Sequence, residues 1–258
     1  MAFAHLDDIE LYYQLDGKRD KPCLLLSNSL GTDLSMWDRQ ATALAAHFFV
    51  VRYDTRGHGR SGSAGPVTIE RLGRDVLGLM DHLDIGRAHF CGISMGGLTG
   101  QWLGVHAPAR IGKLVVANTA ARIGTREAWL ARAAQVRADG MKGVAGSSAG
   151  RWFTPGFIDR EPAAVDRLVQ GLRATSAEGY AACCEALAEA DLRAEVATIA
   201  NPLLAIAGRY DPVTTVEDAR WLSAQAQDAQ VEELAASHLS NIECPEEFSA
   251  CLRRFLAA

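Results

Sequence analysis

The sequence has 258 residues, of which 48% are hydrophobic and 22% charged. This length and composition are typical of an ordinary globular protein with one large α/β domain or two small ones. The net charge of -5 argues against a nucleic-acid-binding protein, because phosphate binding requires clustered Lys and Arg.

Short apolar runs alternate with segments of helical spacing over the first 117 residues. A strand pair is expected at the start, where residues 9–14 alternate in polarity before a turn at Asp16-Gly17. Further strands are expected at 23–26, 48–52, 88–91 and 113–117, and helices at 36–46, 68–83 and 95–106. Such alternation predicts a mostly parallel sheet with helices on both faces.

The alternation stops after this point and resumes near residue 203. Strands are expected at 203–207 and 230–234, and helices at 216–224 and 246–256. The stretch between contains helical segments but no buried strand, and the run 146–150 is expected to be a flexible turn. We therefore predict an α/β core of residues 1–119 and 195–258, with a helical cap at 120–194.

The candidate nucleophile is Ser94, in Gly92-Ile93-Ser94-Met95-Gly96. This Gly-x-Ser-x-Gly pattern follows an expected strand and opens an expected helix, as a nucleophile elbow requires. Small residues allow the sharp turn that projects the hydroxyl, and the helix N-terminus favours negative charge. The alternative is that Ser94 only caps its helix. A second match to the pattern, at 146–150, lacks the preceding strand.

A serine hydroxyl requires a positioned base, and two histidines follow Ser94 in the sequence. His106 ends an expected helix, where it is expected to cap carbonyl groups. His238 lies in a loop after the last expected strand, at the sheet edge where ligands bind in α/β folds. The chain order nucleophile, acid, base therefore favours His238 as the base.

The acid of the triad is expected to follow another strand. Asp211 lies directly after the strand at 203–207 and would orient the imidazole and stabilise its cation. A structural alternative for Asp211 is a turn before Pro212. Asp218 and Asp228 are weaker candidates, because one lies in a helical segment and the other precedes a strand.

Two backbone N–H groups are expected to stabilise the anionic transition state. One belongs to Met95, the residue after the nucleophile. The other is assigned to Leu30, in the loop Ser27-Asn28-Ser29-Leu30-Gly31 that follows the first buried strand.

The sequence carries no pattern that predicts a cofactor, a metal or a membrane. Six cysteines without a C-x-x-C pair are expected to be reduced, buried thiols. The glycine spacing at 56–59 is not a phosphate-binding pattern. No apolar run approaches the roughly 18 residues of a membrane span, and the acidic N-terminus is unlike a signal peptide. We therefore expect a cytoplasmic protein.

Five segments together resemble the α/β-hydrolase family over essentially the whole chain. They are 27–32, 52–59, the elbow at 92–96, 208–214 and 236–241. The segments Ser27-Asn28-Ser29-Leu30-Gly31 and Ser237-His238-Leu239-Ser240-Asn241 are similar to those of 3-oxoadipate enol-lactonases within this family. Many other family members have His-Gly where this chain has Asn28-Ser29.

The resemblance implies hydrolysis of 3-oxoadipate enol-lactone in bacterial degradation of aromatic compounds by the β-ketoadipate pathway. Ser94 would form an acyl-enzyme, and the substrate, a small lactone bearing a carboxylate, would require a cation near the cap. The candidates are Arg122, Arg126, Arg132, Arg137 and Arg151, of which we select Arg126. Trp129 and Trp152 are expected either to line the apolar wall of the pocket or to pack between the cap and the core.

Other functions remain open at this stage. A carboxylesterase or a haloperoxidase- or perhydrolase-like enzyme would use the same triad with a different pocket. A ligand-sensing protein with slow turnover on this scaffold is a further alternative. A dehalogenase is disfavoured, since that chemistry in this fold uses an aspartate where Ser94 stands. The sequence gives no indication of oligomeric state.

Overall fold

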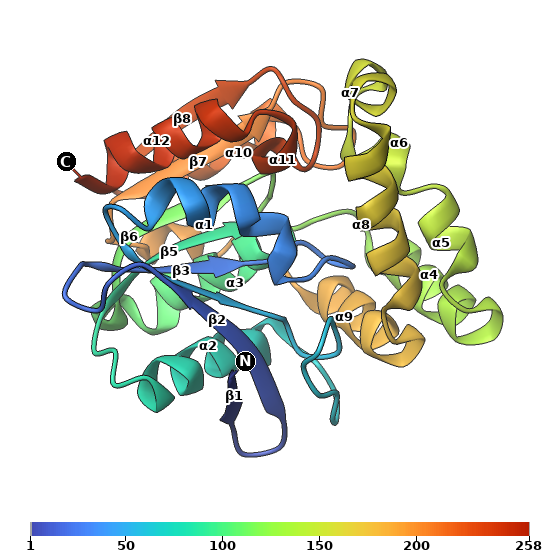
Figure 1. The fold of residues 1–258 in the computed structure, drawn as a ribbon, viewed down its shortest axis with the longest axis horizontal. Helices are drawn as coiled ribbons and strands as arrows, with labels where there is room; N and C mark the ends of the chain where they lie inside the picture. The colour runs from blue at the N-terminus through green and yellow to red at the C-terminus, as the bar shows by residue number, and fades with distance from the viewer. Residues whose placement is uncertain (1, 258) are drawn as a thin grey trace.

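A computed structural model describes residues 2–257 and contains a sheet of eight strands (Figure 1). The strands are β1 (Ala2–His5), β2 (Glu10–Asp16), β3 (Cys23–Ser27), β4 (Phe49–Tyr53), β5 (Ala88–Ile93), β6 (Ile111–Ala117), β7 (Leu203–Gly208) and β8 (Ala229–Leu234). Their order in the sheet is β1-β2-β4-β3-β5-β6-β7-β8. β1 and β2 pair antiparallel at one edge, and all pairs from β4 to β8 are parallel.

The central strands are buried on both faces, which explains their continuous apolar sequences. Every residue of β3, β4 and β7 is buried. Helices α1 (Asp38–Leu44) and α12 (Pro245–Ala257) pack together on one face of the sheet. Helices α2 (Ile69–His82) and α3 (Met95–His106) pack together on the opposite face, and α10 (Val216–Gln225) lies against β7 and β8 (Figure 1). The predicted α/β-hydrolase fold class is confirmed.

The segment between β6 and β7 is helical, and most of it gathers at one end of the sheet (Figure 1). Its helices are α4 (Arg126–Asp139), α5 (Lys142–Gly146), α6 (Ala149–Trp152), α7 (Pro155–Arg160), α8 (Pro162–Ala174) and α9 (Ala177–Glu189). α4 and α9 pack against each other. We refer to this group of six helices as the cap.

Several short elements differ from the sequence expectations. The helix expected at 36–46 is a 3-10 turn, η1 (Leu34–Trp37), followed by α1, because Asp33 caps the earlier start through the Ser35 N–H at 2.8 Å. The expectation of a flexible turn at 146–150 is wrong, since only Ser147 and Ser148 separate α5 from α6. The short elements α11 (Ser240–Glu243), η2 (Pro108–Arg110) and η3 (Val196–Thr198) were not predicted.

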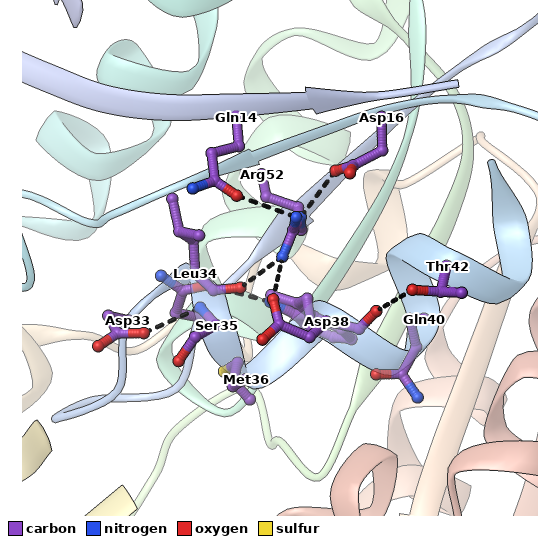
Figure 2. Close-up of polar contacts among 12 residues, drawn as sticks. Gln14, Asp16, Asp33, Leu34, Ser35, Met36, Asp38, Gln40, Thr42 and Arg52 are labelled. Atoms are coloured by element: carbon purple, nitrogen blue, oxygen red, sulfur yellow. Dashed lines mark hydrogen bonds and ion pairs between the residues drawn. The ribbon is translucent and has the colours of Figure 1, made fainter. Parts of the chain in front are cut away.

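Arg52 on β4 holds the segment after β3 against the sheet. Its buried guanidinium donates hydrogen bonds to Asp16 at 2.9 Å and Gln14 at 3.0 Å on β2, and to Asp38 on α1 at 2.6 Å (Figure 2). It also donates to the Leu34 carbonyl at 3.4 Å. A buried cation requires such partners, and here they fix the start of α1 relative to the sheet.

Candidate active site

The carboxyl ends of five parallel strands meet at one edge of the sheet. The strand register pairs Ser27 with Gly92, and Ala117 with both Ile93 and Ile206. The residues directly beyond β3, β5, β6, β7 and β8 therefore lie close together. Each predicted catalytic or oxyanion residue comes from one of these loops, at the edge where open α/β sheets bind ligands.

Ser94 lies in a strained turn between β5 and α3. Its φ of 57° falls in the left-handed region, and the conformation is held by two hydrogen bonds. The Ser94 N–H donates to the Ala117 carbonyl at 3.0 Å, and the Thr119 hydroxyl donates to the Ser94 carbonyl at 2.8 Å. A Cβ at Gly92 would lie 2.1 Å from the Gly96 carbonyl oxygen, so the turn requires glycine. This geometry is that of a nucleophile elbow.

Asp211 and His238 are hydrogen-bonded partners. The Nδ1–H of His238 donates to Oδ2 of Asp211 at 2.8 Å, and both side chains are buried. Asp211 also accepts the N–H groups of Val213 at 2.7 Å and Thr214 at 3.1 Å, and the Thr214 hydroxyl at 2.8 Å. The bond through Nδ1 leaves Nε2 of His238 as the nitrogen able to act on Ser94.

The surroundings of Asp211 keep it ionised. Burial raises the pKa of Asp211, but the hydrogen bond and positive charge of His238 lower it. The Val213 N–H and the Asn118 amide lower it further, and the resulting pKa is below the ordinary value. An ionised Asp211 can orient the imidazole and stabilise an imidazolium.

Asn118 is a site residue that sequence reasoning missed. It follows β6 with a φ of 45°, and its Nδ2 donates to Asp211 Oδ2 at 3.0 Å and to the Ser237 carbonyl at 3.1 Å. Its Oδ1 accepts the Ser240 hydroxyl at 2.5 Å. Asn118 thus joins the acid to the loop that carries His238. Its position directly after a buried strand was the one available signal.

The Leu30 and Met95 amides are available to bind an oxyanion. The neighbouring N–H groups are already used: Gly31 donates to His58 Nε2 at 3.0 Å, and Gly96 donates to the Asn28 carbonyl at 3.1 Å. Within residues 2–257 the N–H groups of Leu30 and Met95 donate to no acceptor. Two free donors beside a nucleophile fit an oxyanion hole.

His58 has a structural role in this arrangement. It is fully buried, and burial lowers its pKa, which keeps the ring neutral. With the proton on Nδ1, His58 donates to the Arg56 carbonyl at 3.2 Å and accepts the Gly31 N–H through Nε2. Arg56 is itself buried against Asp75 at 2.6 Å. His58 therefore stabilises the loop that presents Leu30.

A cavity of about 310 Å³ connects these residues to the cap. Ser94, His238 and Leu30 line it from the core side, and Trp129 and Trp152 line it from the cap. The two tryptophans thus lie where the sequence analysis expected them. A cavity of this size between cap and core fits a small ligand.

Arg126 lies outside the lining of this cavity. Its guanidinium is exposed and pairs with Glu189 on α9 at 2.8 Å. The expectation that Arg126 binds substrate therefore has no support in the structure.

The expectation for His106 is wrong, because its ring contacts Glu195 at 3.1 Å instead of capping carbonyls. Asp218 forms the capping box of α10 with Thr215, whereas the carboxylate that contacts His238 is that of Asp211.

Two other arginines from the list of candidates line the cavity, Arg132 and Arg151. Arg132 lies over the Trp129 ring at 4.9 Å. Arg151 donates to the Ser147 hydroxyl at 2.7 Å and the Val144 carbonyl at 3.3 Å. Burial lowers the pKa of Arg151, and the nearby charge of Arg132 lowers it further. No described carboxylate lies within ion-pair distance of either guanidinium.

The described residues offer no metal site and no membrane span. Within 2–257, no group of three or more His, Cys, Asp or Glu side chains could hold a metal ion. In the same range no helix has the length and apolar character to cross a bilayer. All six cysteines are free thiols.

A family model described as the alpha/beta hydrolase fold matches residues 22–245. The chain belongs to this family. This hydrolase is 52% identical to 3-oxoadipate enol-lactonase 2 of Acinetobacter baylyi, over 96% of this chain and 95% of that protein. It is 47% identical to 3-oxoadipate enol-lactonase 1 of the same organism, over 92% of this chain and 90% of that protein.

Solved structures agree with this assignment. The crystal structure of the enol-lactonase from Burkholderia xenovorans LB400 superposes with a TM-score of 0.98. It is 47% identical and the match covers 100% of both chains. The resemblance to enol-lactonases inferred from the sequence motifs is confirmed by these comparisons.

Proposed function

We propose that this hydrolase opens 3-oxoadipate enol-lactone to 3-oxoadipate, with Ser94, His238 and Asp211 as its catalytic triad. The proposal is supported by the identity of 52% and 47% to two enol-lactonases over nearly the full chain. The elbow, the Asp211–His238 pair and the two free amides supply the parts that acyl transfer requires. In the cell we place this reaction in the cytoplasm, within aromatic-compound degradation by the β-ketoadipate pathway.

In the first half of the reaction, Ser94 attacks the lactone carbonyl and its proton passes to Nε2 of His238. The carbonyl oxygen becomes an anion bound by the Leu30 and Met95 amides. The ring C–O bond then breaks, and the enol oxygen takes the proton from His238. The product of this half is an acyl-enzyme in which the former leaving group stays attached.

In the second half, His238 removes a proton from water, which attacks the acyl carbon. Collapse of the tetrahedral intermediate breaks the bond to Ser94 and returns the proton to the serine oxygen. The enol of the released product becomes the ketone. We also propose that residues 120–194 act as the cap domain over a core of 1–119 and 195–258, shielding these steps from bulk water.

The observation that carries the choice of substrate is the Arg132–Arg151 pair. Two half-buried guanidiniums without carboxylate partners line the same cavity as Ser94. Like charges so placed repel each other, and an anionic ligand relieves that repulsion. A lactone that bears a carboxylate supplies the anion, and a guanidinium can bind it with two parallel hydrogen bonds.

The test compares an acidic with a neutral substrate. We expect Arg132→Met and Arg151→Met each to raise KM for the enol-lactone roughly 10- to 100-fold, as loss of a charge-assisted hydrogen bond implies. KM for p-nitrophenyl acetate, which lacks a carboxylate, should change little. Arg173→Met provides the matched control, because Arg173 is an exposed residue of α8.

Equal increases of KM for the enol-lactone and for p-nitrophenyl acetate would contradict the assigned role of the two arginines. Hydrolysis of neutral esters without turnover of the lactone would favour the carboxylesterase or perhydrolase-like alternative. Binding of the lactone with negligible turnover of any ester would instead favour the ligand-sensing alternative.

A further inference from the structure

Glu243 is a buried carboxylate outside the set of catalytic residues. It is the last residue of α11, five residues after His238, and is 9% exposed. No cationic side chain among residues 2–257 lies within ion-pair distance of it. Its oxygens accept hydrogen bonds from uncharged groups, and a buried polar side chain requires such partners.

These hydrogen bonds connect the core to the cap. On the core side, Glu243 Oε2 accepts the N–H of Ser237 at 2.9 Å. On the cap side, the same oxygen accepts the N–H of Thr154 at 3.3 Å, and Oε1 accepts the Thr154 hydroxyl. Thr154 is the N-cap residue of α7. One carboxylate thus joins the cap to the residue that precedes His238.

A second contact lies on the other side of His238. The N–H of Leu239 donates to the Trp152 carbonyl at 3.0 Å, and the Trp152 side chain lines the cavity. Both chain neighbours of His238 are therefore hydrogen-bonded to residues 152–154 of the cap, one directly and one through Glu243.

The far end of the same loop is fixed to the core. Asn241 donates through Nδ2 to the Met36 carbonyl at 2.9 Å, and Gln40 donates to the Asn241 carbonyl at 2.8 Å. Asn118 also holds this loop from the core, through the Ser237 carbonyl and the Ser240 hydroxyl. The contacts of Glu243 and Trp152 add the connection between this loop and the cap.

We propose that Glu243 is a positioning residue that couples the seating of the cap to the placement of the His238 imidazole. The inference rests on the proposed role of His238 as general base. Asp211 holds the ring through Nδ1, and Glu243 holds the backbone that carries the ring. Removing the carboxylate leaves the Ser237 N–H and Thr154 without their acceptor. The backbone at 237–239 can then shift, and a small displacement of a catalytic base lowers the rate strongly.

The test uses p-nitrophenyl acetate, so that its result does not depend on the lactone assignment. We expect Glu243→Ala to lower kcat on the order of 10- to 100-fold per site titrated with a fluorophosphonate. KM should change less than about threefold, since Glu243 makes no contact in the Ser94 cavity. Glu243→Gln should recover most of kcat, because its amide can accept from Ser237 and donate to the Thr154 hydroxyl.

A second variant tests the coupling from the cap side. Thr154→Val removes the hydroxyl that donates a hydrogen bond to Glu243, and Thr154→Ser keeps this donor. We expect a loss of kcat in the valine variant that serine restores. Since Thr154 acts through Glu243, adding Thr154→Val to Glu243→Ala should lower kcat no further. Glu246→Ala, which removes an exposed carboxylate three residues away, should leave kcat unchanged.

A lower Tm with wild-type kcat per titrated site in Glu243→Ala would overturn the inference, because it would show a purely structural role. Fully additive losses in the double variant would also overturn it. If Glu243→Ala does not fold, wild-type kcat in both Thr154 variants overturns it. A wild-type protein that reacts with neither the ester nor the fluorophosphonate would overturn the proposed function, and the inference with it.

Discussion

Asp54 is a buried acid at the start of the loop that contains Arg56 and His58. It is 2% exposed and accepts the N–H groups of Leu34 and Arg60, each at 2.8 Å. Burial raises its pKa to about 6, against hydrogen bonds that lower it. At pH values between the unfolded pKa near 4 and this folded pKa, Asp54 is protonated in the native protein and ionised in the unfolded chain. Its contribution therefore makes the free energy of unfolding fall as pH rises through this window.

Asp54→Asn removes this dependence, because the amide does not ionise. Between pH 5 and pH 7.5 we expect the stability of the variant to improve relative to wild type by about 1 kcal/mol. Urea denaturation of both proteins at the two pH values measures the difference. If the stability difference between the two proteins stays constant with pH, or if the wild type gains stability relative to the variant as pH rises, the raised pKa of the buried Asp54 is contradicted.

At this scale the residues of the proposed triad could be selected from the sequence, and the residues that contact them could not. Ser94 directly follows β5, Asp211 follows β7 by three residues and His238 follows β8 by four, so each candidate lies in the loop after a strand. Asn118 and Glu243 act through partners such as Asp211, which is 93 residues from Asn118, and Thr154, which is 89 residues from Glu243. No local pattern indicates contacts between such distant residues.

The turn between β5 and α3 depends on close approach of two backbone segments. A methyl group at Gly92 would overlap the Gly96 carbonyl oxygen, which belongs to the first turn of α3. We expect Gly92→Ala to destabilise the protein by about 1 to 3 kcal/mol and to displace Ser94, with a loss of fluorophosphonate labelling. Urea denaturation and active-site titration measure the two effects.

Gly86→Ala is the matched control for this element. Gly86 precedes β5, and a Cβ there meets nothing within 4 Å. The control should keep wild-type stability and labelling. If Gly92→Ala behaved in the same way, the close approach that defines the elbow would be contradicted.

Long elements with clear periodicity were predicted to within a few residues, as at α2 and α3. Short elements were not, since α11 and η1 have four residues each and show no periodicity. Asp33 was the available signal for η1, because a capping carboxylate marks a helix start.

The reactivity of the six cysteine thiols tests the packing of the core over the whole molecule. Five of the six cysteines are buried, and Cys244 is the partly exposed one. Burial raises the pKa of Cys23 to about 12, and burial also raises the pKa of Cys244. We expect the native protein to react with about one equivalent of Ellman's reagent, slowly, and the protein in denaturant to react with six. Rapid reaction of several thiols in the native state would contradict the core packing.

The alternation of strands and helices predicted the long elements around the sheet, but the sequence could not orient the cap. Trp129 has an arginine three residues away on each side, Arg126 and Arg132, and either spacing brings an arginine beside the ring. The packing of α4 on α9 decides between them, because it turns Arg126 toward Glu189 and leaves Arg132 over the ring. That packing depends on tertiary contacts, which cannot be deduced from the spacing of residues along one helix.

The central claim is that Ser94 is the nucleophile of a lactone hydrolase. The most direct test follows the ultraviolet absorbance of enzymatically generated 3-oxoadipate enol-lactone with wild type and Ser94→Ala. We expect rapid loss of absorbance with wild type and a decrease in kcat on the order of 10³-fold or more in the variant, because the triad acts as a unit. Lactone turnover that persists in a folded Ser94→Ala protein, or that is absent from the wild type, would contradict the claim.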